Sequence, residues 1–496
     1  AASDVYKRQV LNSRKFPEWA VPFRHTDKWL MRGEKMANEQ KCNIGVIGLG
    51  VMGSSLAKNM INHGFCTALY SVSDQERKRF ESGKNNYRIF GSIKEFISSL
   101  ERPRKVFLMI TAGKPVDMVI ASLLPLLDRG DIIMDGGNSF YKDTAVRCSE
   151  CAKHGILYMG IGISGGEKGA LYGPSIMAGG SPQAWECVRA ILEAIAARHQ
   201  GKACCGYIAE GGAGHYVKMV HNGIEYAVLE LIAETYQYMR FVKKMGAGEI
   251  RSVFEQWNEG PLNSYLIEIS AKVLGKKEED GGCLIDKILD VAEQKGTGKW
   301  TVAESVERGV YIPSIYEAQM ARIFSTKKEE RTYGAAHLKY SSNEAPGLRT
   351  EEMEKALLLS MILAYSQGFE LISKAAEEEN WNIDLAGLAA VWKDGCIIRS
   401  ALLGRIEQAE ELSGKPLILS AAFSDIGTLE GSLRKMAAAA VLSGMPLPCI
   451  QASLQYYDYY RSDQMPVNFI QALRDYFGAH TYMRCDREGH FHTEWE

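Results

Sequence analysis

The chain has 496 residues, of which 46% are apolar, and its 58 Lys and Arg residues against 60 Asp and Glu residues give a net charge of −2. This length exceeds what one hydrophobic core supports and the composition is typical of folded protein, so we expect two or three globular domains and exclude a disordered chain. The near-neutral charge argues against nucleic acid as a partner. The eleven scattered cysteines indicate reduced intracellular thiols. The best apolar run, Leu357–Ala364, is too short to cross a membrane.

Residues 1–37 differ in character from the rest of the chain. They contain scattered basic residues, two tryptophans and two prolines, but no long apolar stretch of the kind found in a secretory signal. Their acidic residues also count against a transit peptide. We interpret them as a leader that forms no structural domain, and we expect the true start at Met36.

A glycine-rich loop follows the first predicted strand. The apolar run Asn43–Ile47 predicts a buried parallel strand, and a helix is predicted over Ser54–His63. Between them lies a G-x-G-x-x-G motif, made of Gly48, Leu49, Gly50, Val51, Met52 and Gly53. One glycine makes the tight turn, one lets a pyrophosphate approach the backbone, and one allows close helix–strand packing. Placed between strand and helix, the motif predicts dinucleotide binding.

The end of the next predicted strand, Thr67–Tyr70, should indicate which dinucleotide is bound. An acidic residue there would hold the ribose 2′-hydroxyl of NAD, and an Arg would hold the 2′-phosphate of NADP. The strand is followed instead by Ser71, Val72 and Ser73. The basic run Arg77–Arg79 can either reach a phosphate or form a solvated helix face, so the residues alone leave the cofactor open.

Further strands are predicted, and most of them end in small or polar residues. The predicted strands are Val106–Ile110, Asp131–Asp135, Ile156–Ile163 and Ser175–Gly180. The loops after the first three are Thr111–Gly113, Gly136–Ser139 and Ser164–Gly166. Because ligands of an open parallel sheet bind at the carboxyl ends of its strands, these loops predict a shared crevice.

Beyond residue 212 the pattern becomes helical, with helices predicted over Val217–Met245, Glu352–Glu377 and Ile406–Leu412. In the first of them Lys218, His221, Asn222 and Glu225 follow at i, i+3, i+4 and i+7, which places them on one face.

The four polar residues of this face have two interpretations. They can form a solvated stripe, or Lys218 can be a buried base and Glu225 an acid with a raised pKa, a pair suited to proton transfer. Neither His215 with His221 nor Cys148 with Cys151 has the spacing of a complete metal site, so no metal is expected. The segment Gln294–Trp300, with two lysines and a Thr around two glycines, is either a phosphate-holding loop or a connection between helices.

These motifs, together with Gly395–Ser400 and Arg474–His480, resemble those of the decarboxylating 6-phosphogluconate dehydrogenase family, and the resemblance runs from about Asn43 to the C-terminus. It implies an α/β Rossmann-like cofactor domain, a large all-α substrate and dimerisation domain, and a C-terminal tail that inserts into the partner subunit. The corresponding ranges are 38–212, 213–462 and 463–496. The resemblance also implies a cytoplasmic homodimer with shared active sites.

The implied reaction is oxidation of 6-phospho-D-gluconate at C3 with loss of CO2, which yields D-ribulose 5-phosphate in the pentose phosphate pathway. The resemblance makes Lys218 the general base for the C3 hydroxyl and Glu225 the acid that protonates C1 of the enediol. The implied substrate-binding residues are Asn138, Ser164, Gly165, Gly166, His221, Asn222, Tyr226, Lys295, Thr297, Arg322, Arg474 and His480.

The implied cofactor is NADP, with NAD or dual use left open, because the sequence departs from the family at two positions. Where the family usually has an Arg after the second strand this chain has Val72, and where it often has a Lys after the third it has Thr111. The implied cofactor residues are Gly48, Leu49, Gly50, Val51, Met52, Gly53, Ser71, Val72, Ser73, Ile110, Thr111, Ala112 and Asn138. The alternatives are a related β-hydroxyacid dehydrogenase acting on a smaller acid and a catalytically silent nucleotide-binding protein.

Overall fold

The computed structural model of the chain describes residues 41–294, 296–339, 347–409 and 415–496. The leader predicted over residues 1–37 and Lys295 lie outside the described residues.

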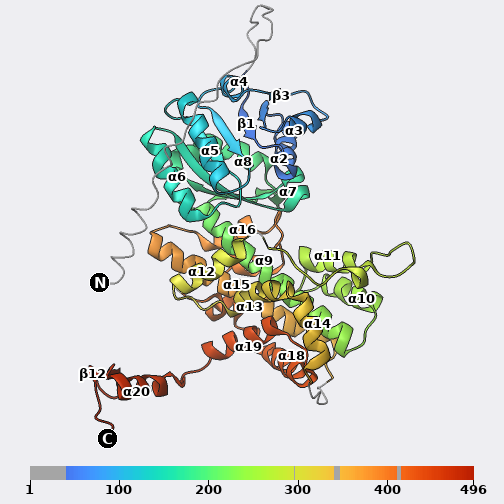
Figure 1. Cartoon of the computed structure of the whole chain (residues 1–496), viewed down its shortest axis with the longest axis vertical. Helices are drawn as coiled ribbons and strands as arrows, with labels where there is room; N and C mark the ends of the chain where they lie inside the picture. Colours follow the sequence, from blue (N-terminus) through green and yellow to red (C-terminus); the bar gives the residue numbers. More distant parts are fainter. Residues whose placement is uncertain (1–40, 295, 340–346, 410–414) are drawn as a thin grey trace, which may run out of the picture. The chain divides into compact units, whose positions relative to one another are not determined.

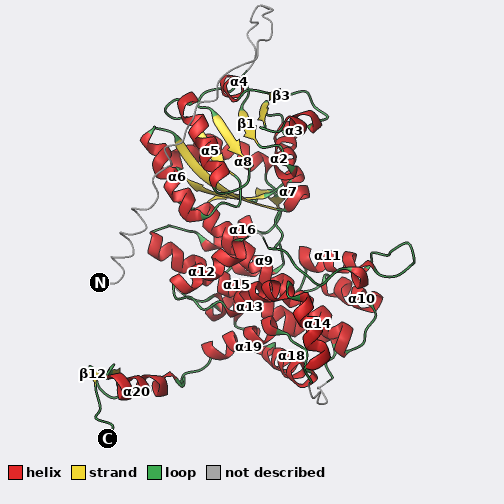
Figure 2. Cartoon of the chain, in the orientation of Figure 1, coloured by secondary structure: helices red, strands yellow, loops and turns green. Residues whose placement is uncertain are grey.

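An eight-stranded sheet forms the first part of the chain, in the order β10-β7-β6-β5-β4-β1-β2-β3. Neighbouring strands are parallel except for β6 and β7, which pair antiparallel. Figure 2 shows this sheet and, after it, a region built of helices. The strands are Ile44–Ile47 (β1), Thr67–Tyr70 (β2), Tyr87–Phe90 (β3), Lys105–Leu108 (β4), Ile132–Asp135 (β5), Leu157–Ser164 (β6), Ser175–Gly180 (β7) and Cys205–Tyr207 (β10), with a small hairpin of Arg198–His199 (β8) and Lys202–Ala203 (β9).

Helices cover both faces of the sheet, so its central strands β1, β4 and β5 are buried along their whole length (Figure 1). On one face Ile44 and Val46 join a core with Leu56 of α2 and Leu192 of α8. On the other face Ile47 joins a core with helices α4, α5 and α6. The helices of this part are Val51–Asn62 (α2), Asp74–Arg79 (α3), Ile93–Ser98 (α4), Lys114–Leu123 (α5), Tyr141–Lys153 (α6), Gly166–Tyr172 (α7) and Pro182–Ile195 (α8), with a 3₁₀ turn at Leu124–Leu126.

Helix α9 packs against β6 and β7 of the sheet and against α12, α13 and α15 of the helical part, so it links the two. The helices of this part are Ala213–Gln237 (α9), Ala247–Trp257 (α10), Tyr265–Leu274 (α11), Thr297–Glu307 (α12), Pro313–Ser325 (α13), Lys328–His337 (α14), Thr350–Glu379 (α15), Leu385–Val391 (α16), Leu402–Glu407 (α17), Glu430–Ser443 (α18) and Pro448–Tyr460 (α19). A π-helical turn extends α9 over Tyr238–Val242, and 3₁₀ turns lie at Leu284–Lys287, Leu417–Leu419, Ala421–Phe423 and Ile426–Thr428. The predicted order, a Rossmann-like sheet followed by a large helical part, is confirmed.

Several element bounds differ from the predictions by a few residues, and two of the differences concern helices of the second part. Residues 410–412 of the helix predicted over Ile406–Leu412 lie outside the described residues, and its described part belongs to a helix that begins earlier, Leu402–Glu407 (α17). The buried residues of α17 are Leu402, Leu403 and Ile406. Helix α15 extends the short run Leu357–Ala364 to 30 residues, so by length and composition it could cross a membrane. However, 89% of its most apolar window is buried inside the protein, as expected for a core helix.

The C-terminal tail has a structure of its own, made of α20 (Val467–Gly478) and a short hairpin of β11 (Tyr482–Met483) with β12 (His490–Phe491). The buried carboxylate of Asp475 joins them by accepting hydrogen bonds from Thr481 N (2.9 Å), Thr493 N (3.1 Å), His492 Nδ1 (2.9 Å) and Trp495 Nε1 (2.9 Å). Helix α20 also carries an exposed apolar face, formed by Val467, Phe469, Ile470, Leu473, Tyr476 and Phe477.

Candidate functional site

The first turns of α9 lie directly on the sheet, and glycines make this possible. A Cβ atom at Gly214 would come within 2.4 Å of Gly160 O, and one at Gly162 within 2.6 Å of the Lys218 Cβ. Any larger residue at either position would force helix and strand apart. The glycine-rich entry of α9 therefore brings Lys218 and its neighbours to the carboxyl end of β6.

Three of the four residues predicted on one face of α9 form a buried hydrogen-bonded group. Lys218, His221 and Asn222 are 6%, 0% and 9% exposed. The Nζ atom of Lys218 lies 3.4 Å from His221 Nδ1, which lies 3.2 Å from Asn222 Oδ1. On the other side of the imidazole ring, His221 Nε2 lies 3.2 Å from Ser164 Oγ at the end of β6. A solvated stripe would not be buried in this way.

Burial sets the protonation of this group. Desolvation lowers the pKa of Lys218 below its ordinary 10.5, and the charge of Glu225 opposes that shift. Desolvation, with the nearby Lys218 charge, lowers the pKa of His221 well below 6.5, so the imidazole is neutral near pH 7. A lysine whose ammonium form is disfavoured and a neutral histidine beside it are suited to accept and hold a proton.

Glu225 lies one turn further along α9, closer to solvent than Lys218. Its side chain is 22% exposed, and its Oε2 atom lies 4.0 Å from His221 Nδ1. The next residue, Tyr226, is buried, and the guanidinium of Arg322 on α13 stacks on its ring with Cζ 3.5 Å from the ring centroid. Glu225, Tyr226 and Arg322 therefore continue the polar face begun by Lys218.

The segment predicted as either a phosphate loop or a helix connection begins α12. Gly296, at φ +92°, precedes the helix, and Thr297 Oγ1 accepts a hydrogen bond from Asn222 Nδ2 at 3.2 Å. A Cβ atom at Gly298 would come within 2.8 Å of the Tyr226 ring, so this loop can only pack here with glycine at that position. The structure thus brings Thr297 to Asn222 and Gly298 to Tyr226.

The loop between β5 and α6 carries Asn138. The buried carboxylate of Asp135 holds this loop by accepting hydrogen bonds from Gly137 N (3.0 Å) and Ser139 Oγ (2.6 Å). Asn138 lies between them with its side chain exposed.

The loop after β6 is held by close packing of glycine. Gly165, at φ +117°, packs on the Gly395 carbonyl, and a Cβ atom at Gly165 would come within 2.5 Å of that oxygen. Gly166 follows at φ +62°.

The G-x-G-x-x-G loop has the form expected of a pyrophosphate site. Gly48 adopts φ +97° beside Ile110, and a Cβ atom at Gly53 would come within 2.0 Å of Gly48 O. A Cβ atom at Gly50, in contrast, would have as its nearest neighbour only Glu76 Oε1, at 3.9 Å. The open side of the loop can therefore admit a phosphate, and the residues present fit a dinucleotide.

The remaining predicted cofactor residues lie around this loop, at the ends of β2 and β4. Ser71 is buried, Val72 is 84% exposed, and Ser73 caps α3 by accepting a hydrogen bond from Glu76 N at 3.3 Å. After β4, Ile110 and Ala112 are half-buried and Thr111 is exposed.

Arg474 and His480 lie apart from this group in the single chain. Arg474 donates to Gln471 Oε1 at 3.0 Å, and the His480 ring lies 5.9 Å from the Phe477 ring, so these contacts stay within the tail. Lys295 lies outside the described residues.

Sequence reasoning missed several residues of the site. The ring of Trp392 meets the His221 ring edge to face at 5.4 Å, and the Cys396 thiol, whose pKa burial raises to about 12, lies near Lys218. Ile397 N donates to Ser164 Oγ at 3.5 Å. The motif Gly395–Ser400 contains Cys396 and Ile397 and could have pointed to them. The sequence does not show, however, which residues this motif contacts in the fold. A further missed residue, Glu76, contacts the glycine-rich loop.

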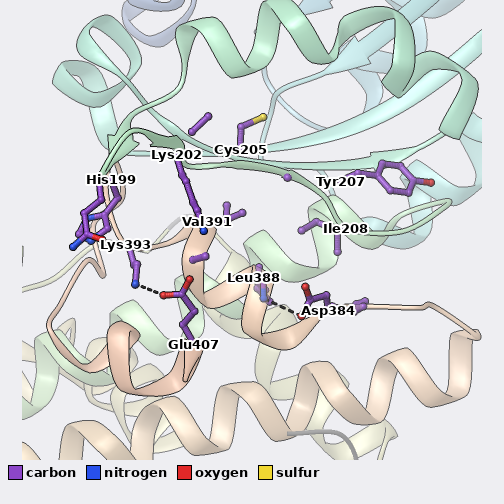
Figure 3. Close-up of a pocket in the computed structure, with 16 residues that line it drawn as sticks. His199, Lys202, Cys205, Tyr207, Ile208, Asp384, Leu388, Val391, Lys393 and Glu407 are labelled. Atoms are coloured by element: carbon purple, nitrogen blue, oxygen red, sulfur yellow. Dashed lines mark hydrogen bonds and ion pairs between the residues drawn. The ribbon is translucent and has the colours of Figure 1, made fainter. Parts of the chain in front are cut away.

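A cavity of about 370 Å³ lies between β10, the β8–β9 hairpin and helices α16 and α17 (Figure 3). An ion pair between Lys393 and Glu407 crosses it, and Asp384 caps α16 through Gly387 N at 2.9 Å. The lining residues that the structure describes include none of the predicted site residues. Among the described residues, no group of three or more His, Cys, Asp or Glu side chains could hold a metal ion.

Comparisons with known proteins identify the family of the chain. A family model described as the NAD binding domain of 6-phosphogluconate dehydrogenase matches residues 43–209, and one described as the 6-phosphogluconate dehydrogenase C-terminal domain matches residues 214–495. The chain is 47% identical over 465 residues to the "6-phosphogluconate dehydrogenase, NADP(+)-dependent, decarboxylating" of Bacillus subtilis (strain 168), with 92% of this chain and 99% of the relative covered. It is 45% identical over 468 residues to the "6-phosphogluconate dehydrogenase, decarboxylating" of Chlamydia pneumoniae, with 91% and 97% covered.

A solved structure shows the same fold. The 6-phosphogluconate dehydrogenase of Plasmodium falciparum superimposes on this chain with a TM-score of 0.87 and 41% sequence identity. The superposition covers 92% of this chain and 100% of the Plasmodium chain. The chain therefore belongs to the 6-phosphogluconate dehydrogenase family.

Proposed function

We propose that this chain oxidises 6-phospho-D-gluconate at C3 and releases CO2 and D-ribulose 5-phosphate, with reduction of NADP or NAD. The single observation that carries the proposal is the buried Lys218 amine, 3.4 Å from a neutral His221 and close to Glu225 on one face of α9. Membership of the family supports the same substrate, because the relatives named above carry that activity in their names.

The proposed chemistry uses Lys218 first as a base and then as an acid. Neutral Lys218 takes the proton of the C3 hydroxyl while the hydride leaves C3. When bound, NADP or NAD accepts that hydride. The product is a 3-keto acid, whose carbonyl is β to the carboxylate, so protonated Lys218 can polarise the carbonyl and CO2 is lost without a metal ion. Glu225 then protonates C1 of the enediol while neutral Lys218 takes the proton of the C2 hydroxyl, which leaves ribulose 5-phosphate.

The other predicted residues would hold the substrate around this pair. Ser164 and His221 lie on the Lys218 side, and Asn222 with Thr297 lies on the α12 side. Arg322, stacked on Tyr226, is suited to meet the phosphate group, since a guanidinium offers several donors to its oxygens. We assign Asn138, Gly165, Gly166 and Lys295 to the same site on the resemblance alone.

We further propose a cytoplasmic homodimer in which each tail completes the partner's site. The exposed apolar face of α20 supports this, because such a face is stabilised by burial against another surface. Arg474 and His480 would then reach the partner's substrate. In this proposal residues 38–212 bind the dinucleotide, 213–462 bind the substrate and the second chain, and 463–496 cross to the partner. The eleven cysteines are free thiols, which suits a reducing compartment.

The test of the activity is product analysis with 6-phosphogluconate. The proposal expects CO2 and ribulose 5-phosphate in equal amounts, in step with reduced dinucleotide. Reduction with 3-hydroxyisobutyrate but not with 6-phosphogluconate would favour the smaller-acid alternative. Absence of turnover with either acid, despite dinucleotide binding, would favour the silent protein.

The test of the shared site is complementation between two inactive chains. Mixing Lys218→Met chains with Arg474→Ala chains should produce mixed dimers with one intact site, and about one quarter of the wild-type activity should return if chains exchange at random. Activity that stays at the level of the two separate variants would contradict a shared site.

A further inference from the structure

A carboxylate lies against the glycine-rich loop, at the end of β2. Glu76 Oε2 accepts hydrogen bonds from Ser71 Oγ at 2.6 Å and from Leu49 N at 3.3 Å. Its other oxygen would be 3.9 Å from a Cβ atom at Gly50. Glu76 comes from α3, so the acid absent from the end of the strand itself is supplied by the following helix.

The local structure holds this carboxylate in place. Ser73 caps α3 by accepting a hydrogen bond from Glu76 N at 3.3 Å, and Ser73 N donates to the buried Ser71 Oγ at 3.1 Å. The hydroxyl of Ser71 in turn donates to Glu76. The backbone and the side chain of Glu76 are thus both tied to the turn after β2, which points the carboxylate at the loop.

Two of the three basic residues of the same helix are held by other groups. Arg77 donates to the Ser71 carbonyl and pairs with Asp74 at 3.2 Å, and Lys78 pairs with Asp74 at 2.6 Å. Val72, where the family usually has an Arg, is 84% exposed and carries no charge. The charged side chain of α3 that hydrogen-bonds to the loop is therefore an acid, Glu76.

We propose that Glu76 makes this chain prefer NAD to NADP. In a Rossmann fold the adenosine ribose lies at the end of the second strand, where an acid accepts a hydrogen bond from the 2′-hydroxyl. A carboxylate has about four acceptor positions, so Glu76 can keep Ser71 and Leu49 and still accept from a ribose hydroxyl. A 2′-phosphate, with a charge of about −1.5 to −2, would be repelled by it. This inference rests on the proposed dinucleotide binding and names the form that is bound.

The experiment measures binding and turnover separately. Isothermal titration compares ADP-ribose with 2′-phospho-ADP-ribose, and initial rates with 6-phosphogluconate compare NAD with NADP by kcat/KM. The variants are Glu76→Gln, which keeps the shape and removes the charge, and Glu76→Lys. The control is Glu81→Gln, an exposed acid after the same helix.

For the wild type we expect at least tenfold tighter binding of ADP-ribose and at least a tenfold preference for NAD. Glu76→Gln should reduce both ratios severalfold, Glu76→Lys should reverse them, and Glu81→Gln should change neither. A wild-type preference for the 2′-phosphate, or ratios unaltered in both Glu76 variants that keep the wild-type melting temperature, would overturn the inference. If the binding ratios behave as expected but no acid is oxidised, the proposed activity fails and the inference stands.

Discussion

The Nζ atom of Lys218 lies 3.4 Å from Nδ1 of His221, and both side chains are buried on the same face of α9. Because the imidazole is neutral, it can share a proton with the amine, whereas an imidazolium would repel the ammonium. The same pairing places the amine at the end of β6, where Ser164 contacts the other ring nitrogen. The relationship therefore fixes both the position and the protonation of the proposed base.

Lys218→Met should abolish hydride transfer while the fold persists. The methionine side chain has a similar length and is better suited to a buried site, but it cannot accept a proton. Loss of a general base typically costs 10²–10⁴-fold, so we expect kcat to fall by about that factor. Substrate and dinucleotide affinities, measured by titration, should change little.

The matched control is Lys272→Met, at an exposed residue of α11 that pairs with Glu268. It should keep wild-type rates. A Lys218→Met enzyme that reduces the dinucleotide at the wild-type rate would contradict the assignment of the base.

The lowered pKa of Lys218 predicts how activity and stability depend on pH. Because the neutral amine is the base, log kcat/KM should rise with pH and level off below 10.5, the ordinary lysine value. Between the folded-state pKa and 10.5 the unfolded chain binds more protons than the folded one, so the free energy of unfolding should rise with pH across that window.

Urea unfolding of the wild type and of Lys218→Met isolates this contribution. The variant should be more stable at neutral pH, and the difference should shrink toward pH 10.5. A difference that stays constant with pH would mean that Lys218 titrates at its ordinary value in the folded state.

Gly162→Ala should lower activity by displacing Lys218. The added Cβ atom would lie 2.6 Å from Lys218 Cβ and 2.9 Å from Gly214 O, so strand and helix must separate. Overpacking of this kind costs about 1–3 kcal/mol of stability. We expect kcat to fall at least tenfold, as measured by initial rates.

The control is Gly248→Ala on α10, where a Cβ atom meets nothing within 4 Å. Since Ala favours helix more than Gly does, this variant should keep activity and gain up to about 1 kcal/mol. If Gly162→Ala retained full kcat, the close contact between β6 and α9 would not be needed to position the amine.

The sequence predicted those parts of the site that local spacing determines. The G-x-G-x-x-G loop and the one-sided spacing of Lys218, His221, Asn222 and Glu225 both follow from the helix period and from glycine geometry. Contacts between distant segments could not be found in this way. Trp392 reaches His221 across more than 150 residues, which requires α15 and α16 to be folded and packed.

Glu76 was missed for a different reason. The acid was sought at the end of β2 itself, and the sequence there reads Ser71–Ser73. The Glu76 side chain reaches the end of β2 only because a short helix, α3, begins after Ser73. One turn of this helix brings residue 76 back next to Ser71. A search for cofactor residues must therefore extend one helical turn beyond the strand.

Asp475→Asn should loosen the tail and weaken substrate binding. Burial would raise the pKa of Asp475, but hydrogen bonds from His492, Thr493, Trp495 and Thr481 lower it to about 2, so the side chain is a carboxylate that accepts four donors. An amide can satisfy only part of this set, since its NH2 group would face donors. Limited proteolysis should then cut between residues 478 and 496.

The effect of Asp475→Asn on KM shows whether the tail contacts the partner's substrate. If the tail brings Arg474 and His480 to the partner's substrate, KM for 6-phosphogluconate should rise severalfold while dinucleotide affinity stays constant. The control is Asp486→Asn, an exposed acid that pairs with Arg484 at 2.7 Å in the same hairpin. Because the folded-state pKa lies below the ordinary 3.8, the stability that Asp475 contributes is present above that value and is lost as pH falls toward 2. An Asp475→Asn enzyme with a cleavable tail and an unchanged KM would show that the tail does not act at the substrate site.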